Sequence, residues 1–226
     1  MYIVLSLGGS LINTDRGIDQ EFLSAIKGII AKSEHKFGIV TGGGFAARKY
    51  ANAVRAKGGN EFEADEAAIK ATKDNAKAVI GAFGKNAYSK VCKDFDEARK
   101  AAKKYKVVVM GGTIPGITTD SDAALLAEAI DARKLINISN VDGIYDSDPR
   151  KNPSAKKFSE LDYHRLIHLA CEFDTRRAGE NFVFDILACK LIARSRIETH
   201  FVSGRNIEDM KAAIEGRKHD GTVIKG

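Results

Sequence analysis

The stretch that decides the fold is Lys106-Val-Val-Val-Met110-Gly-Gly-Thr-Ile-Pro-Gly-Ile-Thr-Thr-Asp120, which an alanine-rich segment follows as far as Ile130. Three successive β-branched residues, apolar without alternation, predict a strand over 106–110 that is covered on both faces. The alanine-rich segment predicts a helix over 120–130, for which Thr119 and Asp122 have the spacing of a capping box. A glycine- and threonine-rich loop between a buried strand and a helix N-terminus directs N–H groups and hydroxyls at one small anion. The stretch therefore predicts a phosphate-binding loop in an α/β protein.

The same order of strand, glycine-rich or polar turn and helix recurs along the chain. Strands are expected at 2–7, 37–40, 106–110 and 135–138, and the turns that follow them are Gly8-Gly9-Ser10, Gly42-Gly43-Gly44, 111–119 and 139–148. Further elements are expected as helices at 19–32, 44–56, 62–83, 94–103, 159–170, 185–194 and 207–214, and as strands at 87–91, 199–202 and 222–224. Because the carboxyl ends of parallel strands lie at one edge of a sheet, the four turns converge there.

This pattern predicts a single domain over residues 1–226, a three-layer α/β/α sandwich with a mainly parallel central sheet. We expect an acceptor-side half at about 1–130 and a nucleotide-side half at about 131–226, both within one continuous fold.

The composition favours a globular protein of the cytoplasm. Of the 226 residues, 44% are hydrophobic and 29% are charged, which suits one substantial core. No apolar run approaches the roughly 18 residues of a membrane span, and no basic leader precedes the first strand, so no membrane partner is expected. The three cysteines lack CxxC spacing, which predicts neither disulfides nor a metal site built from protein ligands. The net charge of +6 suits an anionic partner, and lysines scattered beside acids predict a nucleotide and no nucleic acid.

The glycine turns do not fit the two common nucleotide fingerprints. GxxxxGK[ST] is absent, and no GxGxxG follows the first strand. The chain instead resembles the amino acid kinase superfamily in four motifs, Leu5-Ser-Leu-Gly-Gly-Ser10, Val40-Thr-Gly-Gly-Gly44, the loop 111–120 and Asn140-Val-Asp-Gly-Ile-Tyr-Asp-Ser-Asp-Pro149. Within the superfamily it is similar to the UMP kinases of archaeal type in the loop 111–120, in Ala47-Arg-Lys-Tyr50 and in Lys190-Leu-Ile-Ala-Arg-Ser195. The resemblance covers nearly the whole chain and implies transfer of the γ-phosphate of ATP to UMP, with Mg²⁺, by a homohexamer.

The resemblance also implies roles for individual residues. UMP would be held by Gly43, Asp65, Thr113, Ile114, Pro115, Gly116, Ile117, Thr118 and Thr119. ATP would be held at its phosphates by Gly9, Ser10, Gly44 and Arg48, and around its nucleoside by Ser139, Asn140, Tyr145 and Asp148. Asp120 resembles the aspartate that organises the phosphate-binding cations, and Arg48 and Lys190 are the candidate catalytic cations.

Several of these residues have an ordinary structural alternative. Asp65 lies among other acids on an expected helix, where a solvated carboxylate fits equally well. Asp120 also suits an N-cap, Tyr145 an aromatic anchor of its loop, and Lys190 a solvated helix position.

The chain departs from the superfamily pattern at three positions. Ser6 stands on the first strand where many members carry lysine, Phe45 follows the second glycine turn in place of a cation, and Ile186 stands where proline is usual. Some positive charge must come from elsewhere, and Arg176 and Arg177 are further candidates to touch phosphates or a neighbouring subunit.

Two other functions stay open from the sequence. One is a kinase of another small acid, such as a carboxylate, a carbamate or an isoprenoid phosphate. The other is a nucleotide-sensing or oxyanion-storing subunit without turnover, which the missing lysine at position 6 permits. Asp65 and the threonine-rich loop favour a nucleotide as the acceptor.

Overall fold

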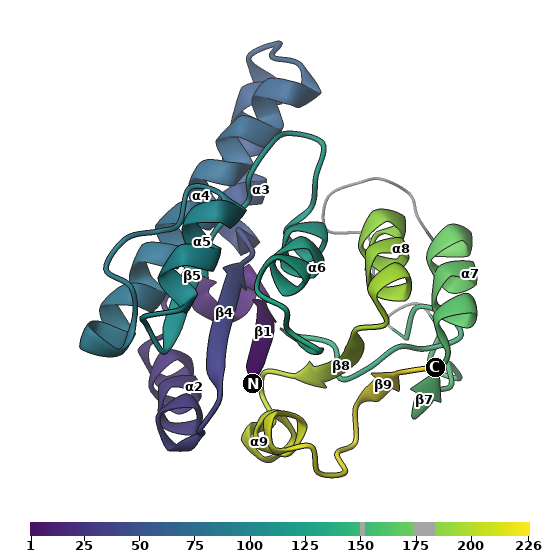
Figure 1. Cartoon of the computed structure of the whole chain (residues 1–226). Helices are drawn as coiled ribbons and strands as arrows, with labels where there is room; N and C mark the ends of the chain where they lie inside the picture. The colour runs from purple at the N-terminus through teal and green to yellow at the C-terminus, as the bar shows by residue number, and fades with distance from the viewer. Residues whose placement is uncertain (150–151, 174–183) are drawn as a thin grey trace.

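A mainly parallel sheet forms the centre of the molecule, as the sequence predicts (Figure 1). The computed structural model describes residues 1–149, 152–173 and 184–226. In this part of the chain the sheet has the order β5-β4-β1-β6-β8-β9-β7. Its strands are β1 (Tyr2–Leu7), β4 (Lys36–Thr41), β5 (Val107–Met110), β6 (Lys134–Ser139), β7 (Glu160–Leu161), β8 (Glu198–Ser203) and β9 (Thr222–Ile224). Neighbouring strands are parallel except β8 and β9, which are antiparallel.

Helices alternate with these strands and cover both faces of the sheet. They are α1 (Gly9–Ile12), α2 (Gln20–Lys32), α3 (Gly44–Ala56), α4 (Glu61–Phe83), α5 (Phe95–Ala102), α6 (Thr119–Ala129), α7 (Tyr163–Phe173), α8 (Ile186–Ser195) and α9 (Ile207–Glu215). A 3₁₀ turn, η1 (Gly84–Asn86), follows α4. In Figure 1, α3 and part of α4 extend beyond the sheet as a helical hairpin. None of the described helices combines the length and the apolar character that crossing a membrane requires.

The core has two parts because successive side chains of a strand point to opposite faces of the sheet. In β1, Val4 belongs to a buried cluster with residues of α5, α6, α7 and α8. Its neighbours Ile3 and Leu5 belong to a second cluster with residues of α2, α4 and α9. Both faces of the strand are therefore buried from solvent, which explains why its sequence is apolar without alternation. The three-layer α/β/α prediction is confirmed.

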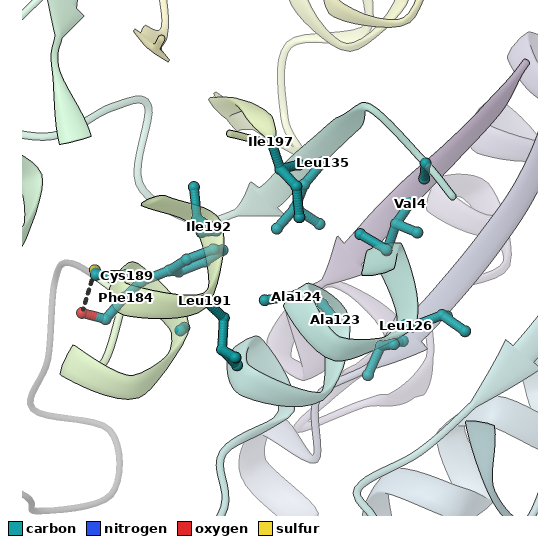
Figure 2. Packing of buried hydrophobic residues seen from close by; sticks show 14 of the residues in the cluster. Val4, Ala123, Ala124, Leu126, Leu135, Phe184, Cys189, Leu191, Ile192 and Ile197 are labelled. Atoms are coloured by element: carbon teal, nitrogen blue, oxygen red, sulfur yellow. Dashed lines mark hydrogen bonds between the residues drawn. The ribbon is translucent and has the colours of Figure 1, made fainter. Parts of the chain in front are cut away.

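Two helices of the first cluster, α6 and α8, pack against each other, and α6 also packs against β1 and β6 (Figure 2). Small side chains on α6, Ala123 and Ala124, allow this close approach. At the start of α8, the Cys189 thiol donates to the Phe184 carbonyl oxygen at 3.6 Å. Cys92 and Cys189 are buried, and the thiols of all three cysteines are free.

Some expected elements differ from the structure. Residues 87–91 form no strand, only an isolated bridge between Ala87 and Val107, because this segment follows the edge strand β5 for too short a distance. The helix expected from residue 159 begins at Tyr163, because residues 160 and 161 pair with β9 as β7. A small hairpin of β2 (Asn13–Thr14) and β3 (Gly17–Ile18) was not expected from the sequence.

The capping box predicted from Thr119 is wrong. Thr118 is the N-cap of α6, and its hydroxyl oxygen accepts a hydrogen bond from the Ser121 N–H at 3.2 Å. Asp122 is not free to reach back to a cap residue, because its carboxylate binds Thr113 instead. Asp120, which the sequence also allows as an N-cap, lies inside the first turn.

Candidate active site

The first two glycine turns touch each other at the carboxyl ends of β1 and β4. A Cβ atom on Gly9 would lie 2.2 Å from the Gly44 nitrogen, so only glycine permits this approach of the two backbones. Gly44 also has a φ of +59°, a left-handed conformation that glycine adopts without a steric penalty. The turns predicted to bind phosphate are therefore brought together at one edge of the sheet.

Helix α4 connects the second glycine turn to the loop 111–119, here called the acceptor loop. The side chain of Asn75 donates to the Gly42 carbonyl oxygen at 2.8 Å. The Thr72 hydroxyl oxygen accepts from the Gly112 N–H at 2.7 Å. Both side chains are buried, so these bonds form out of water, where leaving such groups unpaired is costly. One rigid helix thus sets the spacing between two loops that are distant in the sequence.

The acceptor loop, residues 111–119, is anchored at its tip by Asp65. The Asp65 carboxylate accepts a hydrogen bond from the Gly116 N–H at 2.8 Å. Gly116 has a φ of +82°, which permits the sharp turn after Pro115. Asp65 is half-buried on α4 and faces the loop, unlike the freely solvated carboxylate that the sequence left as an alternative. One of its oxygens holds the loop, which leaves the other to accept a bond from a ligand.

The base of the acceptor loop is anchored by two further carboxylates. The Thr113 hydroxyl and N–H donate to Asp122 at 2.6 and 3.1 Å. Thr118 donates its hydroxyl to Asp185, the N-cap of α8, and Ser121 donates to the same carboxylate at 3.0 Å. The loop is therefore joined to α6 and to a helix of the second half of the chain. The sequence placed Asp185 only at the start of a helix, although an aspartate before an apolar helical pattern is an N-cap signal.

Asp120 lies at the centre of this arrangement, between the acceptor loop and the first glycine turn. The Ser6 hydroxyl donates to Asp120 Oδ1 at 3.0 Å, and Asn137 Nδ2 lies 3.5 Å from the same oxygen. Burial and the nearby Asp185 raise the pKa of Asp120 from 3.8 to about 7, against the lowering effect of the Ser6 hydrogen bond. Burial similarly raises the pKa of Asp122 to about 6, while its bonds from Thr113 oppose the rise. These carboxylates are short of positive charge in the unliganded protein.

A cavity of about 200 Å³ opens beside Asp120 at the carboxyl ends of β1 and β6. Its walls include residues of the first glycine turn and of the segment after β6, among them Gly8, Ser10, Asn137, Ser139, Asn140 and Val141. Phe184 and Phe201 provide an apolar wall. A mixture of small polar groups and aromatic rings suits a nucleotide, whose phosphates and base differ in polarity.

Tyr145 closes the loop that follows this cavity. Its hydroxyl donates to Asp142 at 2.8 Å, and Asp142 also pairs with Lys157 at 2.8 Å. Burial and the Asp142 carboxylate raise the pKa of Tyr145 to about 12. Tyr145 is thus an anchor of the loop, the alternative that the sequence left open. Asp148 lies further along, where its carbonyl oxygen accepts from the Asn152 N–H at 2.8 Å.

Comparison with known proteins places this chain in a family. Residues 1–203 match the model of the amino acid kinase family. The chain belongs to that family. It is 42% identical to the uridylate kinase of Thermococcus onnurineus over the full length of both chains. The crystal structure of the uridylate kinase of Archaeoglobus fulgidus superposes with a TM-score of 0.85 at 42% identity, covering 99% of this chain and 100% of that one. The UMP kinase of Bacillus anthracis shares the fold with a TM-score of 0.82 at 21% identity, over 99% and 95% of the two chains.

The cations expected from the family resemblance do not contact the carboxylates. Arg48 is exposed on α3 and Lys190 is exposed on α8, and neither side chain bonds to a described residue. Arg176 and Arg177 lie outside the described residues. Lys73 on α4, which the sequence analysis did not single out, is the cation that lowers the pKa of Asp122. Ser6, in place of the family lysine, supplies a neutral hydrogen bond to Asp120.

A divalent cation fits the oxygen ligands at this site. Magnesium in proteins is held by one or two carboxylates together with substrate phosphates and water. Asp120 is half-buried, is paired with no cation among the described residues and borders the predicted ATP cavity. No cluster of three or more His, Cys, Asp or Glu in the described chain suits a metal ion, so an ion here would need phosphate ligands.

Proposed function

We propose that this chain is a UMP kinase, which transfers the γ-phosphate of ATP to UMP and gives UDP and ADP for pyrimidine nucleotide synthesis. The observation that carries the proposal is the acceptor loop, tied to Asp65 at its tip and to Asp185 at its base, beside the cavity that Asp120 borders. A site with two anion-binding loops around one carboxylate suits transfer between two phosphate esters. The full-length similarity to proteins named uridylate kinase supports UMP as the acceptor.

The acceptor loop would position UMP by its backbone and hydroxyl groups. The N–H groups of Thr119 and Asp120 open α6 and donate to no described residue, so they are available to an anion. Thr113 and Thr118 are fixed by hydrogen bonds to Asp122 and Asp185, so the loop is held in place before a ligand binds. Asp65, with one oxygen committed to Gly116, would accept from a ribose hydroxyl with the other. Little reorganisation is then needed when UMP binds.

The glycine turns would hold ATP on the opposite side of Asp120. Gly9 and Gly44 allow backbone N–H groups to approach the phosphates without side chains between them. Arg48 is free to turn toward the same phosphates from the second turn of α3. Lys190 is free in the same sense on α8. Phosphoryl transfer needs positioning and charge neutralisation more than covalent participation by the protein, and these groups provide both.

Asp120 would hold Mg²⁺ and orient it toward ATP, with Ser6 and Asn137 fixing the carboxylate. Mg²⁺ supplies neutralisation of charge on the β- and γ-phosphates when it is bound. The raised pKa of Asp120 means that a proton competes with the cation near neutral pH, since only the ionised carboxylate attracts it.

We also propose that the chain acts in the cytoplasm as a homohexamer. Helices α3 and α4 carry large apolar side chains exposed to solvent, with Phe45 50%, Tyr50 40% and Phe62 60% exposed. Such side chains on a protruding hairpin suit contact with other copies of the chain. Light scattering coupled to size-exclusion chromatography would give the mass of six chains, and a monomer at micromolar concentration would contradict the proposal.

The function is tested by incubating the purified chain with ATP, Mg²⁺ and one acceptor at a time. The panel contains UMP, dUMP, CMP, a carboxylate, carbamate and an isoprenoid phosphate, and ADP formation is followed. We expect UMP to give the largest kcat/KM. A preference for one of the small acids would assign the chain another activity within the family, and ATP binding without ADP formation would indicate a binding protein.

A further inference from the structure

A larger cavity, of about 540 Å³, lies at the opposite edge of the sheet from Asp120. It is formed where α6 leads into β6 and where α8 leads into β8, and its lining includes Glu128, Asp131, Arg133, Arg194 and Arg196. β6 and β8 are parallel, so their amino ends share this edge while the candidate active site follows their carboxyl ends. Strands of six residues separate the two sites by roughly 20 Å.

Three arginines line this cavity, and the guanidinium groups of two of them form no ion pair with a described residue. Arg194 pairs with Glu128 through two hydrogen bonds, at 3.1 and 2.5 Å, which neutralises that acid. The side chains of Arg133 and Arg196 are exposed and form no hydrogen bond or ion pair with a described residue. Asp131 is the remaining acid of the lining. Free guanidinium groups in a concave site are suited to phosphate, which they bind through paired N–H donors.

The backbone at this cavity is strained in a way that the rest of the described chain is not. Asp131 and Arg196 have φ values of +55° and +48°, and they are the non-glycine residues with positive φ in the described part of the chain. Both line the same cavity. An arginine in this conformation costs stability relative to glycine, which ends most helices of this kind. Strain of this type gathers at functional sites, where the side chain has a use that offsets it.

We propose that this cavity is a second anion site, which binds the phosphate groups of a small phosphorylated ligand between Arg133 and Arg196. The site does not depend on the proposed kinase activity. Its ligand would touch the C-terminal ends of α6 and α8, the helices whose N-terminal ends carry Asp120 and Asp185. The attraction of the guanidinium groups for phosphate must exceed the repulsion of the anion by Asp131 and by the two helix C-termini. Binding should weaken as added salt screens the guanidinium groups.

Inorganic pyrophosphate is the probe for the test, and equilibrium dialysis of the radiolabelled ion measures the amount bound per chain. The wild-type chain should bind pyrophosphate at a site that the double variant Arg133→Ala, Arg196→Gly loses, with at least about tenfold weaker binding there. Arg165→Ala on α7 is the control, because Arg165 is also exposed and its side chain bonds to no described residue. Glycine suits the backbone at position 196, so Arg196→Gly should also unfold at a higher temperature than the wild type.

A second variant tests the sign of the electrostatics. Asparagine tolerates positive φ, so Asp131→Asn keeps the backbone while removing the opposing charge, and pyrophosphate should bind about threefold more tightly. Equal binding by the wild type, the double variant and the Arg165 control would overturn the proposal, because all binding would then belong to the candidate active site. Kinase assays of the same variants report separately on the proposed function.

Discussion

Asp120→Asn should make the unliganded protein more stable and the enzyme inactive. The pKa of Asp120 rises from 3.8 in the unfolded chain to about 7 in the folded chain. The free energy of unfolding is therefore at its full value below pH 3.8, and it falls as the pH rises through about 7. One pKa unit corresponds to about 1.4 kcal/mol, so the raised pKa lowers the free energy of unfolding by about 4 kcal/mol at pH 8, and by about 2 kcal/mol at pH 5, where the folded chain holds the carboxyl protonated. These values are upper bounds, since water and ions relax around the charge.

The assay is urea unfolding of wild type and variant at both pH values without nucleotide. Asparagine has the same shape and still accepts a hydrogen bond from Ser6, so the gain in the free energy of unfolding should be larger at pH 8 than at pH 5. Asp74→Asn is the control, because this exposed residue forms only a surface ion pair with Lys77 and its loss should change stability by less than about 1 kcal/mol. A variant that is less stable than the wild type at pH 8, or that keeps its kcat, would refute the reasoning.

Three further predictions concern other groups. Arg48→Ala should lower kcat more than it raises the KM for UMP, because the exposed guanidinium is available to the transferring phosphate; an unchanged kcat would remove it from the transition state. Asp65→Ala should raise the KM for UMP at least about tenfold by releasing Gly116 and a ribose contact, whereas an equal loss in kcat with unchanged KM would argue against an acceptor role. His200 bonds to Glu198 and His219, both at 2.8 Å, and burial lowers its pKa to about 4, so its contribution to stability is lost as pH falls below its unfolded pKa of 6.5. His200→Gln should therefore reduce the loss of unfolding free energy between pH 7.5 and pH 5 by about 2 kcal/mol, and equal losses in urea titrations would contradict this.

The strands and glycine turns were predictable because their signals are local. An unbroken apolar run such as Val107–Val109 fits only a strand covered on both faces, and glycines placed directly after such runs mark the edge where ligands bind. Short pairings were not predictable in this way. Glu160–Leu161 forms a strand because β9 lies beside it, and nothing within those two residues favours extended backbone over the helix that follows.

The candidate site was predictable in its loops but not in its connections. Gly9, Gly44 and the acceptor loop meet where strand order places them. The bonds from Thr118 to Asp185 and from Thr113 to Asp122 join residues whose partners depend on how α6 and α8 pack. A hydrophobic pattern locates a helix face, but it does not determine which polar side chains of two helices meet.

The central claim is that this site transfers the γ-phosphate of ATP to UMP, and following the label from [γ-³²P]ATP in a single turnover tests it most directly. With the chain in excess over ATP, and with Mg²⁺ and UMP present, the account predicts that the label moves to the β-position of UDP, and that Asp120→Asn leaves it in ATP. Label that stays in ATP with the wild-type chain, or that appears only as inorganic phosphate, would contradict the claim.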